Sequence, residues 1–306
     1  MLNIMIMNAI VISIDPFIIR LGHLMLRWYS LFFMLAILVG LWLGLREARR
    51  KGLDVELVKS LAVWAVVGGL IGARLFHVID RWDLYAAQPV QSLYVWQGGL
   101  AVYGGLIGGT LAGIVYARRH GLPVWKLADA LTPGIILGLA VGRLACIPNG
   151  DAIGAPANVP WAFVYTNPMS MVPPQLLGVP VHPYPLYEML FDLATLFLFW
   201  RLRHVFKTDG MLFLSYAVAY AIGRFWLSFY RIERVWFWGL QEAQVIALAV
   251  LVIALVFLVW RRQTTRVAPH LTPSRLEGQQ GSESLAQDLE GALPMAEPQG
   301  QREDLA

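Results

Sequence analysis

Two arginines stand inside apolar stretches of the sequence, where a charged side chain is costly and marks a candidate functional site. Arg143 lies near the end of the stretch 124–146, and Arg224 lies within 211–230. A guanidinium is planar, permanently charged and able to donate two parallel hydrogen bonds, which suits it to bind a phosphate. The pair therefore predicts a site for an anionic lipid headgroup. The alternative is structural, because arginines also reach for the membrane interface or pair with a carboxylate.

Further polar residues follow Arg143 at the end of the same stretch. Pro148 and the pair Asn149-Gly150 are expected to end the helix just beyond the arginine. The carboxylate of Asp151 comes next in the sequence. We therefore expect freed backbone groups, an amide and a carboxylate beside the buried guanidinium.

A second polar motif, from His182 to Glu188, opens the apolar stretch 186–203. Its prolines fit the start of a helix, and Glu188 suits the positive end of the helix dipole. A helix start therefore accounts for this motif when it is taken alone.

The stretch 98–109 is dense in glycine. Gly105, Gly109 and Gly113 recur at intervals of four, which favours close helix packing. The stretch is not a phosphate loop, because lysine and serine or threonine are missing from the required places. Tyr103 lies between two glycine pairs, roughly 9 Å inside the outer end of the predicted helix at 1.5 Å per residue. Its small neighbours would leave the hydroxyl accessible to a ligand.

Cysteine and histidine contribute no further site to this interpretation. Cys146 is the only cysteine, which excludes an intrachain disulfide. A lone cysteine in an apolar stretch is more often a small buried hydrophobic residue than a nucleophile. The six histidines are scattered and form no cluster with metal-ligand spacing, so we expect no metal site.

The composition indicates a membrane protein. Of 306 residues, 58% are hydrophobic and only 14% are charged, with a mean hydropathy of +0.58. Soluble domains have about a quarter charged residues. The net charge of +4 needs no nucleic-acid partner, since basic cytoplasmic loops are typical of membrane proteins.

Seven apolar stretches of about twenty residues are each long enough to cross a hydrocarbon core of ~30 Å. We therefore expect an all-α integral membrane protein with seven transmembrane helices. The predicted spans are 28–45, 59–79, 97–117, 124–146, 186–203, 211–230 and 240–260.

The distribution of lysine and arginine predicts the orientation. Alternate loops and the segment after the last span are basic, whereas the intervening loops hold few basic residues and 147–185 holds none. The basic residues are Arg46, Arg49, Arg50, Lys51, Arg118, Arg119, Lys126, Arg201, Arg203, Lys207, Arg261, Arg262 and Arg266. By the positive-inside rule, the N-terminus lies outside and the C-terminus in the cytoplasm. Tyr29 and Arg74 then share the outer layer with Tyr103, Arg143 and Arg224.

The chain outside the spans is expected to be irregular. The first fourteen residues are too short to span and lack the features of a signal peptide, which predicts an interfacial segment. Segment 147–185, rich in proline, glycine and asparagine, predicts an irregular external loop. Residues 1–267 then form the membrane domain, and the polar residues 268–306 form a disordered cytoplasmic tail.

An ordered set of motifs over about residues 15–260 resembles the prolipoprotein diacylglyceryl transferases of bacteria. The pieces are Asp15-Pro16, Arg27-Trp28-Tyr29, Gly72-Ala73-Arg74, Gly98-Gly99-Leu100 through Gly104-Gly105, Gly142-Arg143, Asn149-Gly150, His182-Pro183, Leu186-Tyr187-Glu188, Gly223-Arg224-Phe225 with Phe229 and Arg231, and Gln244. The resemblance implies a seven-span enzyme of the bacterial plasma (inner) membrane. It would transfer a diacylglyceryl group from phosphatidylglycerol to the lipobox cysteine thiol of a prolipoprotein, releasing glycerol phosphate.

The residues and the resemblance together give a candidate site that needs no cofactor. The catalytic candidates are Arg143, Arg224, Tyr103 and Glu188. The candidates for substrate binding are Tyr29, Arg74, Asn149, Gly150, Asp151, Gly154, His182, Tyr187, Arg231 and Gln244. A thiol with a pKa of about 8.5 must lose its proton before it attacks. Glu188, Asp151 and His182 remain alternatives for the proton acceptor, and Tyr103 suits hydrogen-bond donation.

Four positions depart from the family's pattern. Tyr103 stands where many members have histidine, and Asp151 replaces glutamate, so both positions keep a polar group. Cys146 stands where asparagine is usual, and Ser228 replaces a glutamate one turn after Arg224. These last two do not preserve the chemistry, which leaves a catalytically inactive lipid-binding or lipoprotein-binding relative as an alternative. An anion transporter is the other alternative, although neither internal repeats nor paired broken helices are visible.

Overall fold

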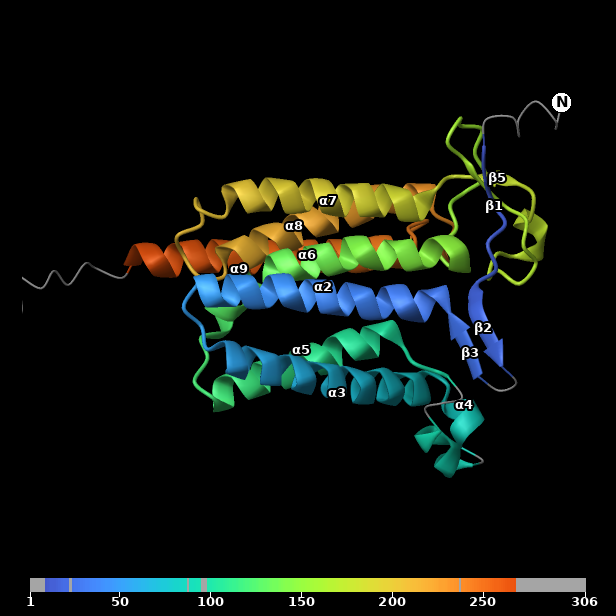
Figure 1. The fold of residues 1–306 in the computed structure, drawn as a ribbon. Coiled ribbons are helices and arrows are strands. Elements are labelled where there is room, and N and C mark those ends of the chain that lie inside the picture. Colours follow the sequence, from blue (N-terminus) through green and yellow to red (C-terminus); the bar gives the residue numbers. More distant parts are fainter. Residues whose placement is uncertain (1–8, 22–23, 87, 95–97, 237, 268–306) are drawn as a thin grey trace, which may run out of the picture. The chain divides into compact units, whose positions relative to one another are not determined.

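The computed structural model describes residues 9–21, 24–86, 88–94, 98–236 and 238–267 (Figure 1). The predicted tail from 268 lies outside the described residues. By its contacts the chain divides after Arg261, and the fold below is that of the part before this point. Its helices are α2 Trp28–Arg50, α3 Val55–Asp80, α4 Trp82–Tyr85, η1 Pro89–Leu93, α5 Val102–Arg119, α6 Val124–Asn149, η3 Pro174–Leu176, α7 Tyr184–Leu202, α8 Met211–Leu227, η4 Ser228–Tyr230 and α9, which starts at Glu242 and continues to Val267.

Five helices of the described part of the chain are long and apolar enough to cross a membrane. They are α2, α3, α6, α8 with η4, and α9 up to Gln263. The protein is therefore a mostly helical membrane protein, as predicted. Helices α5 and α7 were also predicted as spans but are not among these five. Helix α5 is rich in glycine, and α7 carries Glu188, Asp192 and Arg201.

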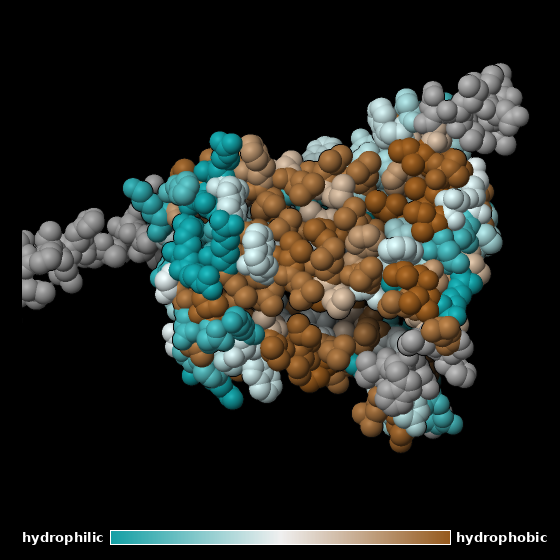
Figure 2. Space-filling model, in the orientation of Figure 1, coloured by the Kyte–Doolittle hydropathy of each residue, from teal (hydrophilic) through white to brown (hydrophobic). Residues whose placement is uncertain are grey.

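The surface seen in Figure 2 has an apolar band across the helices, with hydrophilic residues at both ends and most densely at one end. That end holds the α2–α3, α5–α6 and α7–α8 connections (Figure 1). Many large apolar side chains on the helices are exposed, among them Val63, Trp64 and Leu106. Such a surface is suited to lipid rather than to water.

Two helix pairs pack backbone against backbone through glycine. A Cβ atom at Gly72 of α3 would collide with the carbonyl of Gly104 and lie 2.8 Å from the Cα of Gly108 on α5. A Cβ atom at Gly40 of α2 would lie 2.8 Å from the carbonyl oxygen of Gly134 on α6. The predicted close packing is confirmed at Gly109, where a Cβ atom would lie 3.0 Å from the carbonyl oxygen of Ala65, but not at Gly113, where the nearest atom would be 3.8 Å away.

Side chains and glycines fix the helix ends. The Asp54 carboxylate caps α3 by accepting from the backbone nitrogens of Glu56 and Leu57. Asp129 of α6 is buried and caps α8 from outside, accepting from the nitrogens of Gly210 and Phe213 at 2.9 Å each. Both carboxylates satisfy donors that a helix start leaves free.

Two predicted helix ends differ from those observed. Helix α5 begins at Val102 rather than near 97, because Gly98 and Gly99 adopt φ values of +89° and +77° that no helix contains. Tyr103 therefore lies in the first turn of α5, and its predicted depth was wrong. Helix α6 runs through Pro148 to Asn149, three residues beyond the predicted span. It ends at the Asn149-Gly150 pair, as that motif predicted, with Gly150 as C-cap at a φ of +74°.

The segments expected to be irregular contain short strands. Strand β1 (Ile10–Ile12) pairs in parallel with β4 (Phe163–Tyr165), which pairs antiparallel with β5 (Pro180–Val181). Strands β2 (Phe17–Leu21) and β3 (Leu24–Arg27) form an antiparallel hairpin. The prediction that 147–185 is irregular was therefore wrong in part. Its strands pack with β1 around a small core of Ile12, Ile153, Phe163, Tyr165, Val172 and Val181.

Candidate active site

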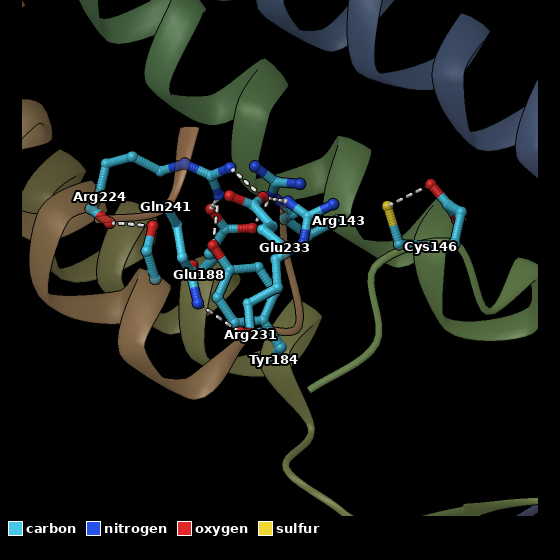
Figure 3. A network of polar contacts seen from close by, with 10 residues as sticks. Arg143, Cys146, Tyr184, Glu188, Arg224, Arg231, Glu233 and Gln241 are labelled. Carbon is cyan, nitrogen blue, oxygen red and sulfur yellow. Dashed lines mark hydrogen bonds and ion pairs between the residues drawn. The ribbon is translucent and has the colours of Figure 1, made fainter. Parts of the chain in front are cut away.

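Glu188 of α7 lies between the two partly buried arginines (Figure 3). Its Oε2 is 2.8 Å from Nε of Arg143 on α6, and its Oε1 is 2.5 Å from Nη1 of Arg224 on α8. The carboxylate is 4% exposed, so the ion pairs are shielded from water. Three helices thus bring the three predicted residues into one cluster.

A second carboxylate, Glu233, joins this cluster from the segment after η4 (Figure 3). Its Oε1 is 3.0 Å from Nη2 of Arg224 and 2.8 Å from Nη1 of Arg231. The hydroxyl of Tyr184, which is fully buried, accepts a hydrogen bond from Nη1 of Arg224. Arg224 is therefore held from three sides, with Arg231 as its neighbour.

Arg143 connects the charged cluster to a second polar group at the end of α6. Glu188 engages its Nε, and Cys146 follows one turn later on the same helix. That thiol lies 3.7 Å from Oδ2 of Asp151. Asn149 donates from Nδ2 to Oδ1 of Asp151 at 2.9 Å. The predicted amide and carboxylate therefore do lie close to the arginine.

Tyr29 contributes to the same polar group from α2. Its side chain interacts electrostatically with Asp151, Cys146 and Arg143. The ring stacks on Phe33 one turn later and remains partly exposed. The Tyr29 hydroxyl is thus available beside Cys146 and Asp151.

An aromatic group surrounds the predicted histidine. Nδ1 of His182 lies 3.2 Å from the hydroxyl of Tyr187, which accepts a hydrogen bond from Nε1 of Trp161 at 2.8 Å. The ring of Tyr230 lies edge-on to His182, with centroids 5.0 Å apart. Partial burial lowers the pKa of His182, because desolvation disfavours the charged imidazolium. The imidazole is therefore neutral at pH 7 and able to accept a proton.

Gly150 and Gly154 are needed for backbone geometry. A Cβ atom at Gly150 would lie 2.7 Å from Cγ2 of Val172, and the residue has a positive φ. Gly154 forms a bridge with Arg231, and a Cβ atom there would lie 2.7 Å from Cβ of His182. These glycines bring the segment after α6 against both His182 and Arg231.

Arg74 binds backbone carbonyls instead of joining the charged cluster. Its Nε donates to Ser92 at 2.7 Å and its Nη2 to Gln91 at 2.9 Å. Its Nη1 donates to Gly98 and Gly99 at 2.7 and 2.9 Å. The guanidinium is thereby committed to the connection between α3 and α5.

Gln244 also makes structural contacts. It is 1% exposed, and its Oε1 accepts from the backbone nitrogen of Gln241 at 2.9 Å, which caps the start of α9. Its Nε2 donates to the carbonyl of Phe225 at 3.4 Å. The side chain thus fastens α9 to α8 directly behind Arg224.

Tyr103 faces the charged cluster from α5. Its side chain is 40% exposed and interacts electrostatically with Glu233, Arg224 and Arg231. No hydrogen bond joins Tyr103 to Arg224 among the described residues, and its role at the site stays a prediction.

The family follows from the sequence as a whole. Residues 16–260 match the protein family described as prolipoprotein diacylglyceryl transferase. The chain belongs to this family. It is 34% identical to a phosphatidylglycerol–prolipoprotein diacylglyceryl transferase of Nostoc sp. over 269 residues, which cover 86% of this chain and 94% of that protein. Proteins of the same name from Geobacillus kaustophilus and Gloeobacter violaceus are 37% and 36% identical and are covered to 96% and 97%, over 84% of this chain in each case.

As a prolipoprotein diacylglyceryl transferase, the chain shows how its departures are accommodated. Ser228 is fully buried, and its hydroxyl donates to the carbonyl of Arg224 at 2.7 Å, so position 228 brings no charge to the cluster. Glu233 instead supplies a carboxylate to Arg224. Cys146 places a thiol one turn after Arg143 and 3.7 Å from Oδ2 of Asp151.

Sequence reasoning missed Glu233 and Tyr184 in this transferase. Glu233 lies two residues after Arg231 in a short loop that was interpreted only through its basic residues. Tyr184 was interpreted as part of a helix start. A carboxylate shortly after the C-terminal end of α8 was the available signal, because every buried arginine needs an anionic or carbonyl partner.

Proposed function

We propose that this protein transfers the diacylglyceryl group of phosphatidylglycerol to the lipobox cysteine thiol of prolipoproteins. The paired guanidinium groups of Arg143 and Arg224 around Glu188 are the observation that carries the proposal. The curated relatives, whose names state this activity, support it over most of the chain.

The reaction forms a carbon–sulfur bond and breaks a carbon–oxygen bond. The thiolate attacks the glyceryl carbon that bears the phosphate, and the electron pair of the broken bond stays on glycerol phosphate. Negative charge therefore grows on the phosphate oxygens in the transition state. Arg143 and Arg224 stabilise that charge, since preorganised donors aimed at a developing anion are a major source of catalysis.

The ion pairs narrow the choice of proton acceptor. Both oxygens of Glu188 are ion-paired with arginines, so a proton bound there would weaken these ion pairs. We assign Glu188 to the orientation of Arg143 and Arg224. Asp151 and the neutral imidazole of His182 remain the acceptors for the thiol proton.

We further propose seven spans in the bacterial plasma (inner) membrane, with the N-terminus outside and the C-terminus in the cytoplasm. Helices α5 and α7 would complete the five apolar helices, and the basic loops at one end support this orientation. A reporter fused after Trp260 should be cytoplasmic, and one inserted in 155–180 should be external. The opposite result at both positions would contradict the assignment.

A transfer assay tests the activity. Purified protein in phosphatidylglycerol vesicles should attach a diacylglyceryl group to a lipobox peptide and release glycerol phosphate in equal amount. The gene should also complement a strain depleted of its own transferase. Lipid or peptide binding without turnover would instead identify an inactive relative, and anion flux across liposomes would identify a transporter.

A further inference from the structure

Glu233 presents one engaged and one unengaged oxygen beside Arg224. Its Oε1 takes the ion pairs with both Arg224 and Arg231. Its Oε2 is buried and has no hydrogen-bond partner among the residues that the structure describes. A buried carboxylate oxygen without a donor costs free energy, so its retention calls for an explanation such as a ligand.

Gln241 also has one polar atom bonded at Arg231 and one buried atom without a partner. Its Nε2 donates to the carbonyl of Arg231 at 3.0 Å, whereas its Oε1 is buried without a partner in the described part of the chain. Arg231 thus contacts Glu233 through its guanidinium and Gln241 through its backbone carbonyl, and each of these two side chains has an unpaired acceptor among the described residues (Figure 3). A ligand that suits this place must bring hydrogen-bond donors.

We propose that Glu233 recognises a headgroup hydroxyl of phosphatidylglycerol and thereby selects this lipid. The inference rests on the proposed function. When Arg143 and Arg224 hold the phosphate, the glycerol moiety beyond it lies next to the arginines. Oε2 of Glu233 accepts a hydrogen bond from a glycerol hydroxyl there.

A neutral hydroxyl suits this place better than an ammonium. The guanidinium groups of Arg224 and Arg231 both contact Oε1 of the same carboxylate. A cationic headgroup at Oε2 would lie within a few ångströms of two positive charges, which opposes its binding. The geometry therefore favours an anionic lipid that carries an uncharged donor.

Phosphatidylpropanol provides the matched probe, because it keeps the phosphodiester charge and lacks both headgroup hydroxyls. We compare kcat/KM for phosphatidylglycerol and phosphatidylpropanol in wild type, Glu233→Gln and Glu233→Ala. Wild type should prefer phosphatidylglycerol about 5- to 150-fold, the range for a buried partner left unpaired. The preference should fall several-fold in Glu233→Gln and to about 1–3-fold in Glu233→Ala. Glu56→Gln, at a 78% exposed carboxylate, should leave it unchanged.

The ratio of kcat/KM for the two lipids shows whether Glu233 recognises the headgroup or only positions the arginines. If Glu233 only orients its arginines, both lipids lose the same factor and the preference persists, which overturns the proposal. Equal use of both lipids by wild type also overturns it, whatever the variants do. Thermal stabilisation by short-chain forms of both lipids gives a second measure of the preference. Because it needs no turnover, selective binding without transfer would uphold the recognition by Glu233 and refute only the proposed enzyme activity.

Discussion

Replacing Arg224 with lysine tests the central cluster with its charge preserved. Arg224 uses Nη1 for Tyr184 and Glu188 and Nη2 for Glu233, so its two terminal nitrogens reach different carboxylates. A lysine ammonium has one nitrogen on an unbranched chain and cannot reproduce this fork. We expect Arg224→Lys to lose at least one charge-assisted hydrogen bond, worth about 1.5–3 kcal/mol of stability.

The effect on activity should be larger than that of one contact. Loss of a principal donor to a developing oxyanion lowers turnover about 10²- to 10³-fold. Initial rates of peptide modification in phosphatidylglycerol vesicles measure this, with a thermal melt on the same sample. Arg20→Lys is the matched control, because Arg20 pairs with Asp15 at 2.6 Å but is 42% exposed. An exposed pair contributes about 0–1 kcal/mol, so this variant should behave as wild type.

Two outcomes would refute this reasoning. If Arg224→Lys is folded and turns over within about threefold of wild type, well short of the expected loss, Arg224 is not a principal stabilising donor. If Arg20→Lys loses as much activity as Arg224→Lys, the burial of the cluster is not what gives Arg224 its importance.

Three further predictions follow from local geometry. Gly72→Ala should destabilise the protein by about 1–3 kcal/mol by overpacking against Gly104, whereas Gly113→Ala meets only ordinary contact at 3.8 Å and should be neutral in the same melt. Tyr103→Phe should lower the rate of transfer about 5- to 150-fold if the hydroxyl binds the headgroup. Tyr103→His should retain substantial activity. A fully active Phe variant together with an unstable His variant would show that Tyr103 only packs. Because the pKa of His182 is lowered in the folded state, its contribution to stability is full above pH ~6.5 and is lost as the pH falls. In thermal melts from pH 7.5 to 5, the melting temperature should fall less in His182→Gln than in wild type. The same dependence on pH in both proteins would contradict this.

The residues of the charged cluster could be predicted because intramembrane charges are rare. Arg143 and Arg224 stood out by type and position, whereas a helix start accounted for the motif of Glu188 until the resemblance was considered. The ion pairs of all three agree with one shared layer. The partners of Arg74 could not be predicted, because backbone carbonyls carry no residue signature. The same applies to the left-handed Gly98 and Gly99, whose conformation shortened the predicted helix.

The strands were beyond sequence reasoning for a different reason. Strands β1 and β4 have three residues each, too few for an alternating pattern to show. In the sequence, the long helices α2, α3, α5 and α6 separate the two strands, which pair with Ile10 opposite Phe163. Only the folded arrangement of the helices brings these segments together.

The glycine contact between α3 and α5 has a consequence for motion near the site. Because backbone meets backbone at Gly72 and Gly104, no layer of side chains between these helices can change rotamer to let one slide along the other. The two helices therefore move together as one rigid unit. Any displacement of α3 that shifts Arg74 must carry Tyr103 with it, and so must change the distance between the tyrosine hydroxyl and the arginines of α8 and its following loop.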